Sequence, residues 1–182
     1  DLLFPVCRPG DSIILTRQLL KQRVPLMGII SPGSPGWYEP TVIKDLGKLV
    51  YYVMDNVPWV NAASPVYQKA NALFNKKYGG YLDTNSGYAY TGILVIADAL
   101  ERAGSADTDK LLAAIRKTDL KAQPMVGDAI RFAENGDNIN AATAMVQVLP
   151  DPDPVKRVKV VLPKSFAQAD YVFPAPQMWD RG

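Results

Sequence analysis

The sequence predicts an α/β fold in which helices cross over a parallel sheet. Over the first ~55 residues, short apolar runs alternate with segments of helical periodicity, a pattern typical of such sheets. Proline and glycine mark the changes from one element to the next. The content of 48% hydrophobic and 21% charged residues is ordinary for a globular protein. Because ligands bind beyond the carboxyl ends of the strands in this fold class, we expect the functional residues in the loops that follow the strands.

The first elements follow from apolar patterning and turn residues. Residues 2–6 form a short apolar run that predicts a strand buried on both faces. Asp11 is placed to cap a helix over residues 12–23. The next elements expected are a strand over residues 26–30, a short helix over 39–47 and a third strand over 48–54.

The middle of the chain predicts three helices, over residues 66–78, 86–104 and 107–118. Ser64 is the expected N-cap of the first helix. The second is apolar almost all round, so we expect it to pack against a sheet, with Asn85 or Ser86 as its N-cap and Gly104 after its end.

Strand patterns return in the last third of the chain. A strand with an Asn-Gly turn is expected within residues 127–138, and two more strands within 141–150 and 155–163. Residues 171–179 predict a tail stiffened by proline.

Composition excludes several classes of function. The net charge is only +2 and its charges are scattered, which argues against binding to nucleic acid. The chain has no histidine and a single cysteine, Cys7, so neither an internal disulfide nor a cysteine-based metal site can form. We expect Cys7 to be a buried, inert thiol, although the neighbouring Arg8 would favour its thiolate slightly if it were exposed. No cofactor, metal or catalytic residue is predicted.

Four segments occur in a familiar order: "DSIILTRQLLKQR", "YEPTVIKDLG", "FNKKYGGYLDTNSGYAYTGILVIADALERAGSAD" and "GDAIRFAENGDN". This succession resembles the second half of the type I periplasmic solute-binding proteins of ABC transporters, in the Leu/Ile/Val-binding group. The motif "KKYG", the helix "Y.Y.G..V.ADAL..AGS" and the late "I.F...G.N" turn carry the resemblance. It extends from Asp1 to about Leu149, and the tail "FPAPQMW" is similar to members that resemble binders of aromatic acids.

The resemblance implies a two-lobed α/β protein with parallel sheets, helices on both faces, and a ligand clamped between lobes that three crossovers join. Residues 1–57 would form the later part of the second lobe, 58–138 a return into the first lobe, and 139–182 the crossover back with the C-terminal tail. The chain would lack the N-terminal half of such a protein. The partner that covers the exposed surface of this chain would then be that half or a swapped copy of this chain. The implied location is periplasmic, with an ABC transporter permease as a further partner.

The resemblance also implies ligand-facing loops in the second lobe. Arg8 would hold a ligand carboxylate in a bidentate fork; the alternative is a surface arginine that covers a strand end. Ser31, Gly33 and Ser34 lie in the loop where amino-acid binders carry an acid for the ligand's ammonium group, and this loop has none. Because a buried ammonium without a charge partner is costly, a carboxylate without an amine is favoured. Trp37 could stack on an aromatic ring, although simple packing is the more common role.

Three more candidate ligand-binding residues lie at or after the expected crossover. Trp59 sits at the crossover itself, and Tyr88 could donate a hydrogen bond to a ligand oxygen while its ring lines the pocket. Asn85 could contact the ligand or serve only as a helix cap. For each, the alternative is an ordinary structural role.

The favoured function is therefore binding of a small carboxylate-bearing solute, an aromatic acid rather than an amino acid, for an ABC importer. A branched-chain amino-acid binder and an extracellular sensory domain of the same fold remain alternatives. An enzyme on a related doubly wound fold is disfavoured because the chain offers neither a nucleophile–base pair nor a metal site.

Overall fold

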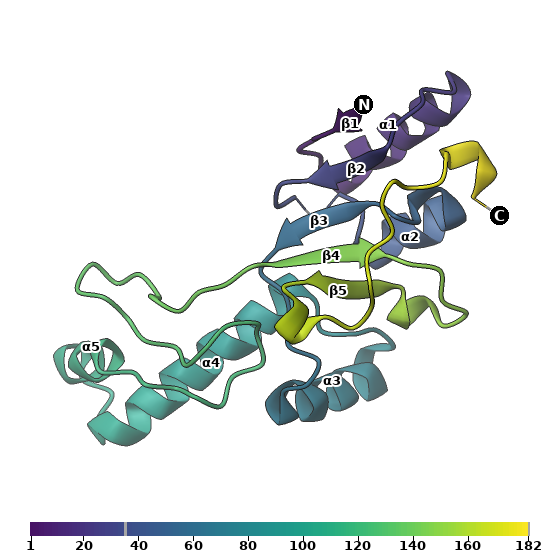
Figure 1. The fold of residues 1–182 in the computed structure, drawn as a ribbon. Coiled ribbons are helices and arrows are strands. Elements are labelled where there is room, and N and C mark those ends of the chain that lie inside the picture. Colours follow the sequence, from purple (N-terminus) through teal and green to yellow (C-terminus); the bar gives the residue numbers. More distant parts are fainter. Residues whose placement is uncertain (35, 182) are drawn as a thin grey trace. The chain divides into compact units, whose positions relative to one another are not determined.

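A five-stranded mixed sheet organises the first of two units into which the chain divides (Figure 1). The computed structural model describes residues 1–34 and 36–181. Unit 1 comprises Asp1–Val57 and Ala144–Gly182, and unit 2 comprises Pro58–Thr143. This division lies close to the boundaries expected from the sequence, whose assignment to two lobes stays a prediction.

The strands of unit 1 lie in the order in which they occur along the chain. They are β1 (Leu2–Leu3), β2 (Gly28–Ser31), β3 (Met54–Val57), β4 (Ala144–Val148) and β5 (Val158–Leu162). The first three are parallel, and β4 and β5 are antiparallel to their neighbours. Parallel neighbours need a crossover, which is usually a helix, and α1 (Pro9–Lys21) and α2 (Pro40–Leu46) supply it. The predicted α/β fold class is confirmed.

Two predicted strands are wrong in extent. The run at residues 2–6 is paired only at Leu2 and Leu3, on the sheet edge, and Val6 is 76% exposed. It is therefore not buried on both faces. The run at residues 48–54 is mostly not a strand: a 3₁₀ helix covers Gly47–Val50, Tyr52 has φ 69°, and β3 begins only at Met54. The left-handed Tyr52 breaks the extended backbone that β-branched and aromatic propensity predicted.

The N-cap of α1 also differs from the prediction. Arg8 occupies the cap position, Pro9 begins the helix, and Asp11 lies in the first turn, where its Oδ2 accepts the Arg8 backbone N–H at 3.3 Å. Proline suits the first helical position because its φ is already helical and it has no N–H to leave unpaired. Helix α1 therefore starts three residues earlier than the capping pattern indicated.

The C-terminal tail is held to unit 1 through a buried glutamine. The Gln147 side chain of β4 donates to the Tyr52 and Val172 carbonyls, both at 3.0 Å, and accepts the Val172 N–H at 2.9 Å. Further along, Arg181 donates to the Leu49 carbonyl at 2.6 Å. These hydrogen bonds from side chains to backbone hold the tail on unit 1. The C-terminal segment also contains the short 3₁₀ helices Lys164–Phe166 and Met178–Asp180.

Unit 2 is built around three helices, α3 (Pro65–Tyr78), α4 (Thr84–Ala103) and α5 (Thr108–Arg116) (Figure 1). Ser64 caps α3 as predicted, whereas the N-cap of α4 is Asp83 rather than Asn85 or Ser86. Asp83 Oδ1 accepts the Ser86 N–H at 2.9 Å, so a carboxylate two residues before Asn85 takes the capping role. Gly104 ends α4 in the left-handed conformation, as predicted.

Residues 58–143 are all described and contain no strand of the sheet. The predicted strand within 127–138 is wrong: only isolated bridges, such as Leu120 to Ile130 and Phe132 to Asn138, pair this segment. The prediction that α4 packs against a sheet is also not met within the unit, since Ile93, Ile96 and Leu100 are exposed. Apolar composition alone did not show what covers this helix.

Candidate functional site

A buried turn of serines follows β2 in unit 1. Ser31 ends the strand, and Ser34 is three residues on; we call residues 31–34 the serine turn. The two hydroxyl oxygens are 2.7 Å apart, and Ser34 also donates its backbone N–H to Ser31 Oγ at 3.3 Å. Gly33 sits between them at φ 102°, and a Cβ there would lie 3.2 Å from the Asn56 carbonyl oxygen. The turn therefore needs glycine at this position.

Asp55 of β3 faces the serine turn and was missed by the sequence analysis. It is the register partner of Ser31, and its Oδ1 accepts the Gly33 N–H at 3.0 Å. The residue is 2% exposed, and its Oδ2 is buried without a hydrogen-bond partner in the part of the chain that the structure describes. The available signal was an acid inside the apolar run "VMDNV". A charged residue in such a run is rarely fully buried unless it is paired.

Burial determines the protonation of Asp55. Loss of hydration raises the pKa of its carboxyl from 3.8 to about 7, although hydrogen bonds from the Gly33 amide, the Ser31 hydroxyl and neighbouring amides act to lower it. Removing a carboxylate from water disfavours its charged form, and only a partner charge or enough donors can restore it. The serine turn therefore holds an acid that is largely neutral below about pH 7.

The loop that carries Arg8 meets the serine turn. Cys7 donates its backbone N–H to Ser34 Oγ at 3.1 Å, which ties the segment after β1 to the segment after β2. Arg8 itself is exposed, and no ion pair engages its guanidinium within residues 1–34 and 36–181. Burial, and then the Asp11 carboxylate, raises the pKa of the half-buried Cys7 thiol. Because Cys7 is not exposed, the condition under which Arg8 would favour its thiolate is not met, and the raised pKa agrees with the inert thiol that the sequence predicts.

Trp37 lies in the core of unit 1. It is 1% exposed, and its indole N–H donates to Thr16 Oγ1 of α1 at 3.0 Å. These surroundings are those of the packing role that the sequence left open. Contact with a ligand ring stays a prediction for Trp37.

The other three candidates lie in unit 2. Trp59 is buried, and its carbonyl accepts the Val126 N–H at 2.7 Å. Asn85 is exposed in the first turn of α4 and is not its cap. Tyr88 is 48% exposed and lines a cavity of about 40 Å³ together with Thr91 of the same helix. A space of this size is suited to ordered water rather than to an aromatic solute.

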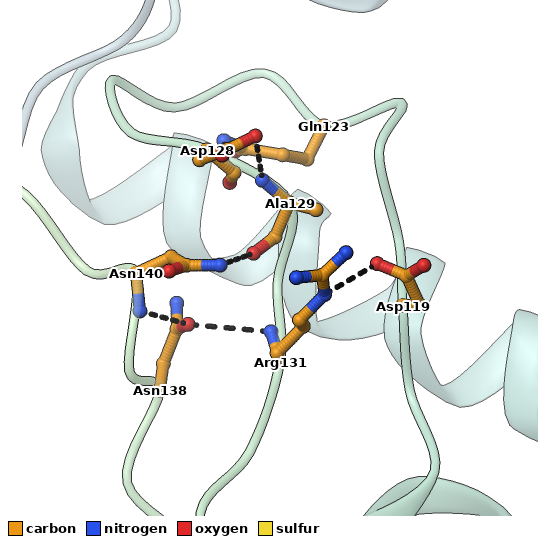
Figure 2. Close-up of polar contacts among 7 residues, drawn as sticks. All are labelled: Asp119, Gln123, Asp128, Ala129, Arg131, Asn138 and Asn140. Carbon is orange, nitrogen blue, oxygen red and sulfur yellow. Dashed lines mark hydrogen bonds and ion pairs between the residues drawn. The ribbon is translucent and has the colours of Figure 1, made fainter.

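Amide and carboxylate side chains order the loops beside this cavity (Figure 2). Asn140 donates to the Ala129 carbonyl at 2.6 Å, and Asn138 Oδ1 accepts the Asn140 and Arg131 N–H groups at 3.2 and 3.4 Å. Figure 2 shows the Arg131 guanidinium turned toward Asp119, with Nε 2.8 Å from Oδ1. Each amide is used to hold backbone, so this network stabilises the loops.

Neither a metal-binding cluster nor a membrane-spanning helix occurs among the described residues. Residues 1–34 and 36–181 hold no group of three or more Cys, Asp or Glu side chains that could bind a metal ion. Among the same residues, no helix has the length and apolar character that crossing a membrane requires.

A family model for periplasmic binding proteins matches residues 16–151. The match covers more than half of the sequence, so the chain belongs to the periplasmic binding protein family, as the resemblance indicated. No match was found among curated proteins.

Solved proteins share the fold. A leucine-binding protein, LivK, from Thermotoga maritima is 24% identical over 81% of this chain and 41% of its own, with a TM-score of 0.67. The substrate-binding protein LivJ from Streptococcus pneumoniae, solved with isoleucine, is 12% identical over 90% and 45%, with a TM-score of 0.66. An amino-acid ABC transporter substrate-binding protein from Pseudomonas fluorescens is 16% identical over 100% and 47%, with a TM-score of 0.64. The chain thus spans less than half the length of each of these proteins.

Proposed function

We propose that this chain belongs to the extracytoplasmic solute-binding component of an ABC importer and contributes a binding surface for a small carboxylate-bearing ligand. Membership of the periplasmic binding protein family supports a binding role without catalysis, delivery of the solute to a membrane permease, and a periplasmic location.

One observation carries the ligand assignment. The hydrogen bond from Cys7 N–H to Ser34 Oγ brings the loop with Arg8 against the serine turn, beyond the carboxyl ends of the neighbouring parallel strands β1 and β2. This is the edge at which α/β sheets bind ligands. Arg8 offers a planar fork that matches a carboxylate, and its guanidinium is exposed. The serine hydroxyls add uncharged hydrogen-bonding groups.

The protonation of Asp55 behind the serine turn favours an acid over an amino acid as the ligand. Asp55 is the acid beside the serine turn, and burial keeps it largely neutral below about pH 7. A neutral carboxyl gives an ammonium group no charge partner. A carboxylate without an amine therefore fits the serine turn better than a zwitterion does.

Branched-chain amino acids are the second candidate. The proteins of similar fold include a leucine-binding protein and one solved with isoleucine. Their likeness supports this candidate only through the shared fold, since their identity to this chain is below 25%.

Isothermal titration of the intact protein separates these ligands. The panel consists of benzoate, phenylacetate, leucine and isoleucine, with benzyl alcohol as an aromatic control that lacks the carboxylate. We expect heat from an aromatic acid and none from the alcohol. Heat from leucine with none from any aromatic acid would overturn the aromatic preference, and binding of the alcohol would overturn the carboxylate requirement.

A further inference from the structure

Helix α4 has a second apolar face that unit 2 does not cover. The buried positions of the helix are Thr84, Gly87, Thr91, Val95 and Ala99. On the opposite side, Ile93 is 64% exposed, Ile96 44% and Leu100 37%. A Cβ placed at Gly92 would meet no atom within 4 Å among the described residues. A second helix could therefore approach this side of α4 closely.

The exposed face of α4 carries no charge. None of the exposed residues between positions 86 and 100 is ionisable as an acid or a base except the tyrosines at 88 and 90, which are neutral at pH 7. The acid in this stretch, Asp98, is half-buried and pairs with Arg102 of the same helix at 2.6 Å. Contiguous apolar surface without charge marks an interaction site on a globular protein.

The spacing of the apolar residues is typical of a helix pair. We call the following residues, which recur alternately every three and four positions, the α4 stripe: Ser86, Ala89, Ile93, Ile96, Leu100 and Ala103. This spacing keeps them on one side of the helix. It is also the spacing at which the side chains of two helices interlock along a seam.

The α4 stripe is symmetric about its centre. In an antiparallel pair with a two-fold axis between residues 94 and 95, Ile93 lies opposite Ile96 of the second copy. In the next layer, the large Leu100 lies opposite the small Ala89 of the second copy. A face that occupies both sides of a two-fold interface must be complementary to itself. A sheet packed on α4 would not require such symmetry, so the pattern favours a second copy as the occupant.

We propose that the α4 stripe is a self-association surface through which two copies of this chain pair, with their α4 helices antiparallel. The proposal goes beyond the proposed function and does not depend on the ligand. Burial of apolar side chains drives the pairing. The stripe offers far fewer side chains than the roughly 20–30 residues per partner of a standard interface, so we expect a dissociation constant on the order of 10 μM.

Sedimentation velocity of the 182-residue chain tests the pairing, at concentrations from well below to well above this value. We expect a change from monomer to dimer. Ile93→Glu should raise the dissociation constant by about 100-fold or more, because each copy would bury an unpaired carboxylate in the seam. The matched control is Leu73→Glu on α3, where the leucine is 62% exposed, and it should dimerise like the wild type.

Because Ile93 is exposed in the monomer, Ile93→Glu should keep the free energy of unfolding measured in dilute solution. Loss of the dimer is then not a loss of folding. A chain that stays monomeric at every concentration would overturn the proposal, and so would a dimer that Ile93→Glu leaves intact.

A charge pair tests the register. Ile93→Glu and Ile96→Lys should each be monomeric alone, and their mixture should form a heterodimer, because the antiparallel register places the introduced carboxylate opposite the introduced ammonium. A parallel pair would place each introduced charge opposite an isoleucine. A mixture that remains monomeric would therefore contradict the antiparallel register.

Amide hydrogen exchange distinguishes a second copy from another occupant. We expect the amides of residues 89–100 to exchange more slowly as the concentration of the 182-residue chain rises, and this effect to be absent in Ile93→Glu. If these amides are instead protected only in a monomeric intact protein, another part of that protein covers α4, and the proposal is wrong.

Discussion

The backbone N–H of Gly33 donates to the Asp55 carboxyl at 3.0 Å and so joins the turn after β2 to the strand β3. This close approach to β3 requires glycine, because a side chain at position 33 would be strained at φ 102° and its Cβ would lie 3.2 Å from the Asn56 carbonyl oxygen. The same approach closes the turn over the carboxyl, which leaves Asp55 2% exposed. A buried acid is thus hydrogen-bonded to the backbone of the turn at the proposed ligand site.

Stability should decrease as pH rises from about 4 to 7. The folded-state pKa of Asp55 is about 7 against 3.8 for a solvated carboxyl, so the folded chain binds the extra proton in this window. Above pH 7 the folded state bears the full cost of the buried charge, about 4 kcal/mol at most. Urea unfolding at pH 4.5 and 7.5 measures the free energy of unfolding at each pH. Asp55→Asn should remove most of the difference between the two values. An equal pH dependence in both proteins would contradict this assignment.

Replacement of Arg8 by alanine should weaken carboxylate binding. A hydrogen-bonded charge contributes about 1.5–3 kcal/mol, which corresponds to roughly a 10- to 100-fold loss of affinity. Titration calorimetry of the intact protein measures this loss. Arg17→Ala, an exposed arginine on α1, is the matched control and should bind normally. Unchanged affinity in Arg8→Ala would leave Arg8 as a surface residue that covers a strand end.

Thr16→Val should destabilise unit 1 without changing its core volume much. The variant removes the acceptor of the Trp37 indole N–H and leaves that donor buried. An unpaired buried donor costs about 1–3 kcal/mol. The midpoint of denaturant unfolding measures the change, with Thr108→Val on α5 as an exposed control. A loss of ligand affinity with no loss of stability would instead favour a ligand role for this part of the core.

Gln147→Leu should release the C-terminal tail. The leucine keeps the volume but leaves the Tyr52 and Val172 carbonyls and the Val172 N–H without their partner. We expect a loss of about 2–4 kcal/mol and faster proteolysis within residues 163–181. Gln18→Leu on the exposed face of α1 is the control. An unchanged cleavage rate would show that other contacts hold the tail.

The pattern of elements was predictable because local rules determine much of it. The Ser64 cap, the Gly104 helix end and the alternation of strand and helix all follow from short-range chemistry. Strand lengths were less predictable. The run at residues 48–54 has the aromatic and branched residues of a strand, yet a 3₁₀ helix and the left-handed Tyr52 precede the start of β3 at Met54.

The candidate site was half predictable. The rule that ligands bind beyond the strand ends identified the loops of Arg8 and Ser34, and the structure joins those loops through the Cys7 N–H. Asp55 could not be found in this way, because its importance comes from a partner 22 residues earlier in the chain.

By itself, the sequence determined the α/β class, the family and most helix ends, since these depend on periodicity, caps and ordered motifs. Only the tertiary structure decided that Trp37 donates to Thr16 in the core and that a buried acid with a raised pKa lies behind the serine turn. The reason is physical: burial and hydrogen-bond geometry arise between segments distant in the chain, and a carboxyl's charge depends on them.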